Sequence, residues 1–179
     1  MQNRRNRSTG TECSKAARDM TAVDPTPPIR SERGTGWVVV QFTLMAALLL
    51  TGPVYRATWS GGWTWPLAGA LLAIGAWAGI LGKRDLGAQR TPYVAPKDDG
   101  CLVTTGIYAR VRHPLYLGVI ALGFSWALLW RSGPALALAA LQIPFLDLKA
   151  RREEHCLRER YAGYAGYARR VKRFIPGLY

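Results

Sequence analysis

The sequence predicts an all-α integral membrane protein with about four transmembrane helices and a helical C-terminal extension in the cytosol. Apolar residues gather into four blocks that are nearly free of charge, and Lys and Arg crowd into the segments between and after them. With 179 residues, 49% hydrophobic and 20% charged, the overall composition would suit an ordinary globular domain. The separation of the two residue classes along the chain excludes a soluble one.

One membrane domain is predicted over 36–179, with spans at about 36–51, 65–81, 114–130 and 134–148. Each block has 15 to 17 residues, near the lower limit of the roughly 17 to 25 that cross a bilayer as a helix. The first three blocks have no polar face, and too little polar sequence remains to cover four such helices in water. Pro114 suits the first helical turn of the third block. The fourth continues without a further break to Tyr161, so one helix is expected to leave the membrane, with a possible kink at Pro144.

The distribution of Lys and Arg along the chain predicts how the protein is oriented in the membrane. Twenty-two of the 24 Lys and Arg residues lie before the first block, between the second and third, or after the fourth. Only Arg56 and Arg131 lie in the other two connections. The positive-inside rule then places both termini and the middle loop in the cytosol of a multi-pass cell-membrane protein. Membrane topology explains the net charge of +13 better than nucleic-acid binding does.

Residues 1–35 combine seven basic residues with prolines and almost no large apolar side chains. This composition predicts a disordered basic tail, with contact to anionic lipids as the alternative. In the second block, Gly75 and Gly79 stand four residues apart. Such spacing lets helices approach closely, and packing within the chain is favoured over a dimer interface. No obligate protein partner is inferred, and the three cysteines form no metal-binding motif.

The candidate chemistry lies in two cytosolic segments, 100–118 and 149–176. At the start of the third block, free N–H groups beside His113 can take an anion. After the fourth block, Glu153 and Glu154 lie on an otherwise basic helix. A carboxylate near a helix N-terminus makes a bipolar pocket, which suits a zwitterionic ligand.

The runs LVTTGIYARVRHPLYLG (102–118) and REEHCL (152–157) carry a resemblance to a known family, together with Tyr164, Tyr167, Val171 and 174–176. They resemble the isoprenylcysteine carboxyl methyltransferase family, whose superfamily includes phospholipid N-methyltransferases. The resemblance covers roughly the last hundred residues. It implies a membrane enzyme that transfers a methyl group from S-adenosyl-L-methionine to a lipid-like acceptor.

Position by position, the resemblance implies three sets of site residues. The cofactor pocket would comprise Gly100, Cys101, Leu102, Val103, Tyr108, His113, Pro114, Leu115, Tyr116 and Glu153. The acceptor's anionic group would be held by Lys149, Arg151 and Arg152. Arg152 and Glu153 would be the catalytic pair.

Carboxyl O-methylation of a prenylcysteine-like group is the favoured reaction, with a phospholipid, small thiol or amine as the alternative acceptor. An acceptor carboxylate is already ionised, whereas an amine needs a base such as Glu153, Glu154 or His113. Two rivals from other classes are a non-catalytic assembly or carrier protein and a membrane reductase that uses a nicotinamide cofactor. Membrane lipids are the other expected partners.

The sequence also departs from the family pattern, most visibly at Ile107, at Gly100-Cys101, at Lys172 and in a shortened Tyr161–Tyr164 spacing. The repeated YAGYAGY run that begins at Tyr161 has two interpretations. It is either an amphipathic segment on the membrane surface or a lid over the substrate. In the first interpretation, the basic residues that follow contact lipid headgroups: Arg169, Arg170, Lys172 and Arg173.

Overall fold

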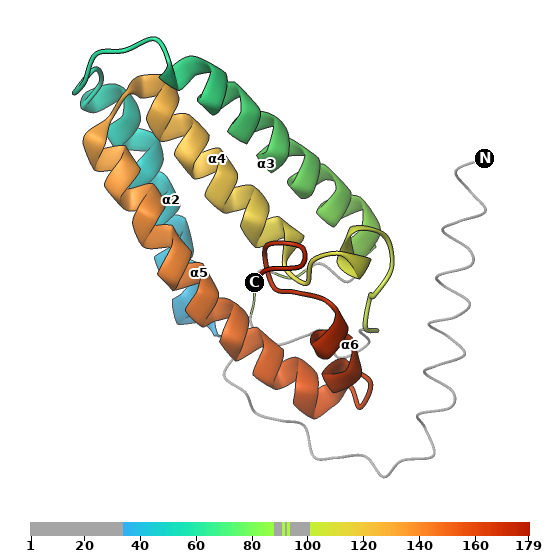
Figure 1. Ribbon diagram of the computed structural model, residues 1–179. Coiled ribbons are helices and arrows are strands. Elements are labelled where there is room, and N and C mark those ends of the chain that lie inside the picture. Colours follow the sequence, from blue (N-terminus) through green and yellow to red (C-terminus); the bar gives the residue numbers. More distant parts are fainter. Residues whose placement is uncertain (1–33, 88–90, 92, 94–100) are drawn as a thin grey trace.

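The computed structural model describes residues 34–87, 91, 93 and 101–179, and every regular element within them is a helix (Figure 1). The elements are α2 (Thr35–Val54), α3 (Thr64–Leu86), η2 (Gly106–Ala109), α4 (Pro114–Trp130), α5 (Gly133–Arg160) and α6 (Tyr164–Arg170). The predicted all-α class is therefore confirmed. The predicted tail lies almost wholly outside the described residues.

Two helices, α2 and α3, are long and apolar enough to cross a membrane, and α4 is a shorter apolar helix of 17 residues. The bounds of α4 agree with the predicted third block because Pro114 begins it. Helix α5 runs unbroken for 28 residues through Pro144, as predicted, and its second half is highly charged. The first two blocks were predicted too short, since α2 continues to Val54 and α3 to Leu86.

The four long helices run side by side, with α4 between α3 and α5 (Figure 1). Helix α2 packs on α4 and α5. Two short connections meet at one end of this bundle, where the backbone N–H of Ala57 donates to Trp130 O at 2.9 Å and that of Thr58 to Arg131 O at 2.9 Å. The opposite end holds the start of α4, the charged half of α5 and α6.

Small residues allow α3 and α4 to approach closely. A Cβ at Gly75 would lie 2.7 Å from Leu122 Cγ, and one at Gly118 would lie 3.2 Å from Gly75 O. A Cβ at Gly69 would meet nothing within 4 Å. Gly75 thus packs within the chain, which is the interpretation that its spacing favoured.

The outer faces of the bundle are apolar. Among the described residues, large hydrophobic side chains at least 45% exposed include Phe42, Leu49, Leu50, Leu67, Leu72, Ile80, Leu141 and Leu148. They lie on α2, α3 and α5. Exposed apolar surface of this extent is typical of helices that face lipid.

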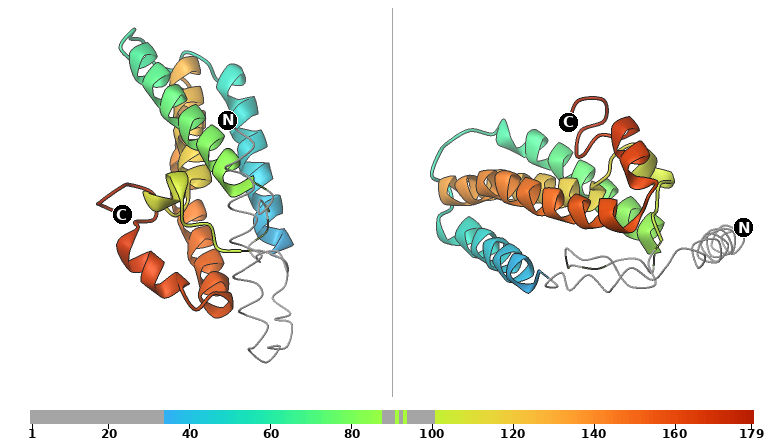
Figure 2. Two further views of the ribbon diagram at one scale, coloured as in Figure 1. Left: turned by 90° about the vertical axis from the view of Figure 1, so that its right-hand side faces the viewer. Right: turned by 90° about the horizontal axis from the view of Figure 1, so that it is seen from below.

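The C-terminal segment folds back over the end of the bundle (Figure 2). Helix α6 packs on α5. The chain beyond α6 then pairs with the residues before α4: the N–H of Arg112 donates to Lys172 O at 2.9 Å, and that of His113 to Arg173 O at 3.0 Å. Two segments 60 residues apart in the sequence are thereby fixed to each other.

Candidate functional site

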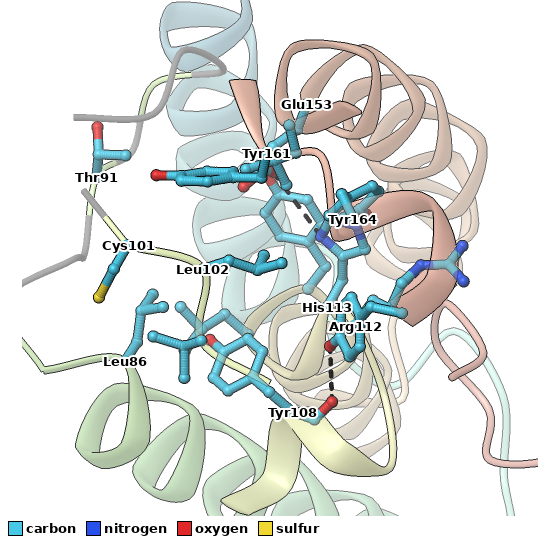
Figure 3. A pocket seen from close by; sticks show the side chains of 15 residues that line it. Leu86, Thr91, Cys101, Leu102, Tyr108, Arg112, His113, Glu153, Tyr161 and Tyr164 are labelled. Atoms are coloured by element: carbon cyan, nitrogen blue, oxygen red, sulfur yellow. Dashed lines mark hydrogen bonds and ion pairs between the residues drawn. The ribbon is translucent and has the colours of Figure 1, made fainter. Parts of the chain in front are cut away.

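A pocket lies at this end of the bundle, between the end of α3, the start of α4, the charged half of α5 and α6 (Figure 3). The described residues that form its walls are mostly aromatic and aliphatic, with one arginine, one histidine and one carboxylate among them. The lining residues are Leu86, Thr91, Cys101, Leu102, Val103, Tyr108, Arg112, His113, Leu115, Tyr116, Glu153, Leu157, Tyr161, Tyr164 and Tyr167.

The structure brings together most of the residues predicted to form the cofactor pocket. Eight of them line it: Cys101, Leu102, Val103, Tyr108, His113, Leu115, Tyr116 and Glu153. Pro114 is buried at the first position of α4 and does not line the pocket. Gly100 lies outside the described residues.

The three residues predicted to bind the acceptor's anionic group lie outside the pocket wall. Lys149 is buried behind Tyr116, with its Nζ 5.5 Å from the centroid of that ring, and it donates to Gln41 Oε1. Arg151 is exposed and donates to Asp147 Oδ2 at 2.8 Å. Arg152 is exposed on the surface of α5, so a catalytic contact by it would require a different arrangement from the one seen here.

The polar centre beside the pocket is Glu154, whose side chain is only 1% exposed. Its Oε1 accepts hydrogen bonds from Arg112 Nη2 at 2.9 Å and from Arg173 Nε at 3.0 Å. Arg158 Nη2 lies 3.4 Å from Oε2. Burying a carboxylate is costly unless it is paired, and here several cations compensate a single anion.

The imidazole of His113 lies between the two carboxylates. Its Nε2 is 3.2 Å from Glu154 Oε1, and its Nδ1 is 3.8 Å from Glu153 Oε2. The ring stacks on Tyr116, with the centroids 5.2 Å apart and the planes 4° from parallel. Tyr116 in turn donates to Glu153 Oε2 at 2.8 Å. These contacts fix the histidine ring beside the one carboxylate that lines the pocket.

The two arginines also anchor the C-terminal segment. Arg112 Nη1 donates to Ala168 O at 2.8 Å and to Val171 O. Arg173 Nη1 donates to Asp147 Oδ1 at 2.6 Å. The pocket wall made by α6 is therefore held by hydrogen bonds from Arg112, which precedes α4, and the chain beyond α6 is held to α5 by the ion pairs of Arg173.

Charge and burial set the protonation states around the pocket. Burial by itself raises the pKa of the Glu154 carboxyl, but hydrogen bonds from His113 and Arg173, with the nearby positive charge, outweigh this and hold the pKa well below its ordinary value. Burial raises the pKa of Tyr108 and Tyr164 well above the ordinary range, and raises that of Tyr167 to about 12. At neutral pH the carboxylate is ionised and these phenols are neutral.

Sequence reasoning missed the residues that meet only through the tertiary fold. Arg112 lies in the predicted segment 100–118 but was assigned no partner, and Arg173 was a lipid contact in one of the two interpretations; both pair with the buried Glu154. The lipid assignment of Arg173 is wrong because a buried carboxylate takes its guanidinium. The tyrosines of the YAGYAGY run are at most 8% exposed and line the pocket, so they are not on the membrane surface. The presence of a second carboxylate next to Glu153, amid basic residues, was the only signal available.

The fold and site together define a helical membrane protein with an aromatic pocket at one end of its bundle, closed by a buried carboxylate–arginine cluster. The chain belongs to the phospholipid methyltransferase family, whose model matches residues 63–163. The matched range runs from the start of α3 to the residue before α6, so it contains most of the pocket lining but not Tyr164 and Tyr167. The family resemblance is thus confirmed at the level of the superfamily, and membership indicates a membrane methyltransferase. The narrower isoprenylcysteine assignment stays a prediction.

Two curated relatives are similar to most of the chain. One is the cobalt-zinc-cadmium resistance protein CzcN of Cupriavidus metallidurans, 34% identical over 154 residues that cover 83% of this chain and 65% of the relative. The other is the nickel-cobalt-cadmium resistance protein NccN of Alcaligenes xylosoxydans xylosoxydans, 33% identical over 157 residues, covering 83% of this chain and 66% of the relative. The chain therefore spans just under two thirds of the length of each.

Proposed function

We propose that the protein is an S-adenosyl-L-methionine-dependent methyltransferase that acts on a lipid-like or small amphipathic acceptor at the inner face of the membrane. The observation that carries the proposal is the position of Glu153. This carboxylate lines an aromatic pocket formed by both of the segments that resemble the family, and its side chain is 26% exposed.

The residues present fit the chemical groups of this cofactor. S-adenosyl-L-methionine carries a sulfonium and an ammonium, and Glu153 together with the tyrosine faces can bind these cations. Leu86, Leu102 and Val103 offer an apolar wall for the adenine. Arg112 and Arg173 are already paired with Glu154. Among the described residues of the pocket lining, the negative charge of Glu153 is therefore the one that a ligand can pair with.

The bound cofactor would supply an activated methyl group on a sulfonium, so that no nucleophilic side chain is required. The work left to the protein is to align the acceptor with the methyl group and to exclude water. The rigid attachment of α6 to α4 and α5 supports that role, since Arg112 holds the backbone of the tyrosine-bearing wall in place.

The pocket contents favour an amine over a carboxylate as the methyl acceptor. A carboxyl acceptor of the prenylcysteine type needs a nearby cation, and Lys149, Arg151 and Arg152 lie outside the pocket wall. A phospholipid or small-molecule amine must instead lose a proton before it attacks. The Nδ1 atom of His113, beside Glu153, can accept that proton.

Membrane topology supports the same function. Four spans, with both termini on the cytosolic side, would place the pocket at the inner surface, where acceptors from the inner leaflet can enter. The exposed apolar faces of α2, α3 and α5 support this arrangement, as does the predominance of described Lys and Arg residues at the pocket end of the bundle.

The names of the two relatives raise a second candidate, a contribution to tolerance of divalent cations such as cobalt and cadmium. This role is compatible with methyl transfer to a membrane component. Cells that carry wild-type protein or a Glu153→Gln variant would be compared for growth on these cations. Loss of tolerance in the variant would link the phenotype to the pocket.

Binding of S-adenosylhomocysteine to the purified protein in detergent tests the proposal. We expect the wild type to bind and Glu153→Gln to bind at least roughly tenfold more weakly, since loss of a charged partner costs about 1.5–3 kcal/mol. Glu159→Gln is the matched control, because Glu159 is exposed on the same helix, where it pairs with His155. No binding by the wild type would overturn the proposal. Incubation with labelled methyl donor and lipid extract would then identify the acceptor.

A further inference from the structure

Most hydrogen-bond donors around the pocket are already in use. Arg112 lines it, but each of its guanidinium nitrogens donates to the protein. Nε and Nη2 lie 3.0 and 2.9 Å from Glu154 Oε1, and Nη1 donates to Ala168 O and Val171 O. Most N–H groups of this arginine are therefore engaged within the protein, which leaves the tyrosine hydroxyls as the other candidate donors to a ligand oxygen.

The tyrosine hydroxyls of the pocket differ in whether they already have a hydrogen-bond partner. Tyr116 donates to Glu153 Oε2 at 2.8 Å, and Tyr167 to Tyr108 O at 2.6 Å. Tyr108 reaches Gly82 O at 3.5 Å. The hydroxyl of Tyr164 is buried and has no hydrogen-bond partner within the described part of the chain.

Tyr164 cannot easily turn its hydroxyl elsewhere. The residue is 1% exposed, and its ring packs edge-on against Tyr167 with the centroids 5.8 Å apart. Its backbone N–H donates to Tyr161 O at 2.9 Å. Tyr167 is itself anchored to η2 through Tyr108 O. A buried hydroxyl that lacks a partner destabilises a fold, so its retention in a rigid pocket wall calls for an explanation.

We propose that the Tyr164 hydroxyl is a ligand-binding group of the pocket and donates a hydrogen bond to an oxygen of the bound methyl donor. The inference rests on the proposed function and assigns a contact to the shortened YAGYAGY run. Two sources of such an oxygen exist in S-adenosyl-L-methionine, the carboxylate and the ribose hydroxyls. Tyr164 lines the pocket together with His113 and Leu102 (Figure 3), so a ligand that fills the pocket would lie against this residue.

The protonation state of Tyr164 agrees with a donor role. Burial, with the nearby Glu154 carboxylate, raises the pKa of the phenol well above its ordinary value. The hydroxyl therefore keeps its proton over the whole physiological range. A neutral phenol can donate to a carboxylate or a ribose oxygen without adding charge to the pocket.

The test is isothermal titration of the full chain in detergent with S-adenosylhomocysteine and, separately, with 5′-methylthioadenosine, which lacks the carboxylate. For Tyr164→Phe we expect the Kd for S-adenosylhomocysteine to rise roughly two- to tenfold, the usual effect of one lost hydrogen bond. A weakening confined to S-adenosylhomocysteine assigns the contact to the carboxylate. Weakening of both probes assigns it to the ribose.

Thermal unfolding distinguishes a ligand-binding role of the Tyr164 hydroxyl from a structural one. The thermal midpoint of ligand-free Tyr164→Phe is expected to stay unchanged or rise, because the change removes an unpaired buried hydroxyl. That of Tyr167→Phe is expected to fall, because it loses its bond to Tyr108 O. Tyr55→Phe, at the opposite end of the bundle, controls for the substitution itself. If the wild type binds both probes and Tyr164→Phe binds them equally well, the inference is wrong while the proposed function stands.

Discussion

At the scale of single residues, Glu153 and Glu154 are neighbours with different tasks. Successive helix positions point about 100° apart, so one carboxylate faces the pocket and the other faces the protein interior. Glu154 is surrounded by Arg112, Arg173 and His113, whereas Glu153 lines the pocket, accepts a hydrogen bond from Tyr116 and lies beside the histidine. Glu154 therefore stabilises the fold, and Glu153 is available to a ligand.

Removing the charge of Glu154 is expected to destabilise the fold strongly. Glu154→Gln leaves Arg112 and Arg173 largely buried without their anion, and breaking a buried ion pair in this way costs about 3–5 kcal/mol. Thermal or denaturant unfolding in detergent measures the loss. Glu159→Gln on the same helix should change stability by less than about 1 kcal/mol. Equal stability of the two variants would contradict the structural role of the cluster.

The same carboxylate predicts a dependence of stability on acid. Because the pKa of Glu154 is lower in the folded protein than its ordinary value of 4.5, the folded state binds fewer protons than the unfolded state in acid. Its contribution to stability is complete above that value and is lost as the pH falls below it. Unfolding measured between pH 7 and pH 3 should show this loss in the wild type. The dependence should be shallower in any Glu154→Gln protein that folds.

At the scale of elements, the sequence predicted helices well where a local signal marks their ends. Pro114 and the Arg131-Ser132 turn bound α4, and the prediction was correct there. Helix α2 passes through Gly52-Pro53, which the prediction took as its end, because a proline in the last turn removes only one helical hydrogen bond. Helix α3 continues through Lys83 and Arg84, since long basic side chains extend to water without breaking a helix.

Close packing of α3 on α4 gives a prediction at this scale. Gly75→Ala places a methyl group against Leu122 and the backbone of Gly118, and such overpacking costs about 1–3 kcal/mol. Gly69→Ala, on the same helix with open space around it, should be neutral or more stable by up to about 1 kcal/mol, because alanine favours helix. Unfolding midpoints of both variants in detergent provide the comparison. A destabilised Gly69→Ala beside an unaffected Gly75→Ala would place the helix interface elsewhere.

At the scale of the whole molecule, the sequence predicted which segments meet but not how they are connected. Family resemblance placed His113 and Glu153 in one pocket, and the structure brings them to 3.8 Å. The cluster of Arg112, Glu154 and Arg173 could not be predicted, because these residues lie 42 and 19 positions apart and no local pattern specifies such pairs. Their meeting depends on the return of the chain beyond α6, which only the tertiary fold defines.

The distribution of charge over the whole molecule predicts its orientation in the membrane. Among the described residues, Arg56 and Arg131 lie in the two connections at the end of the bundle opposite the pocket, and the other lysines and arginines lie at the pocket end. The positive-inside rule then puts the pocket in the cytosol and the turn that contains Ser60 outside.

Ser60→Cys should therefore react with a membrane-impermeant maleimide in intact right-side-out vesicles. The wild type, treated in parallel, gives the background labelling. Labelling of Ser60→Cys above the wild-type background only after permeabilisation would invert the orientation and place the pocket on the outer face. An outer pocket would be cut off from a cytosolic supply of methyl donor, so this experiment bears directly on whether the site can act as proposed.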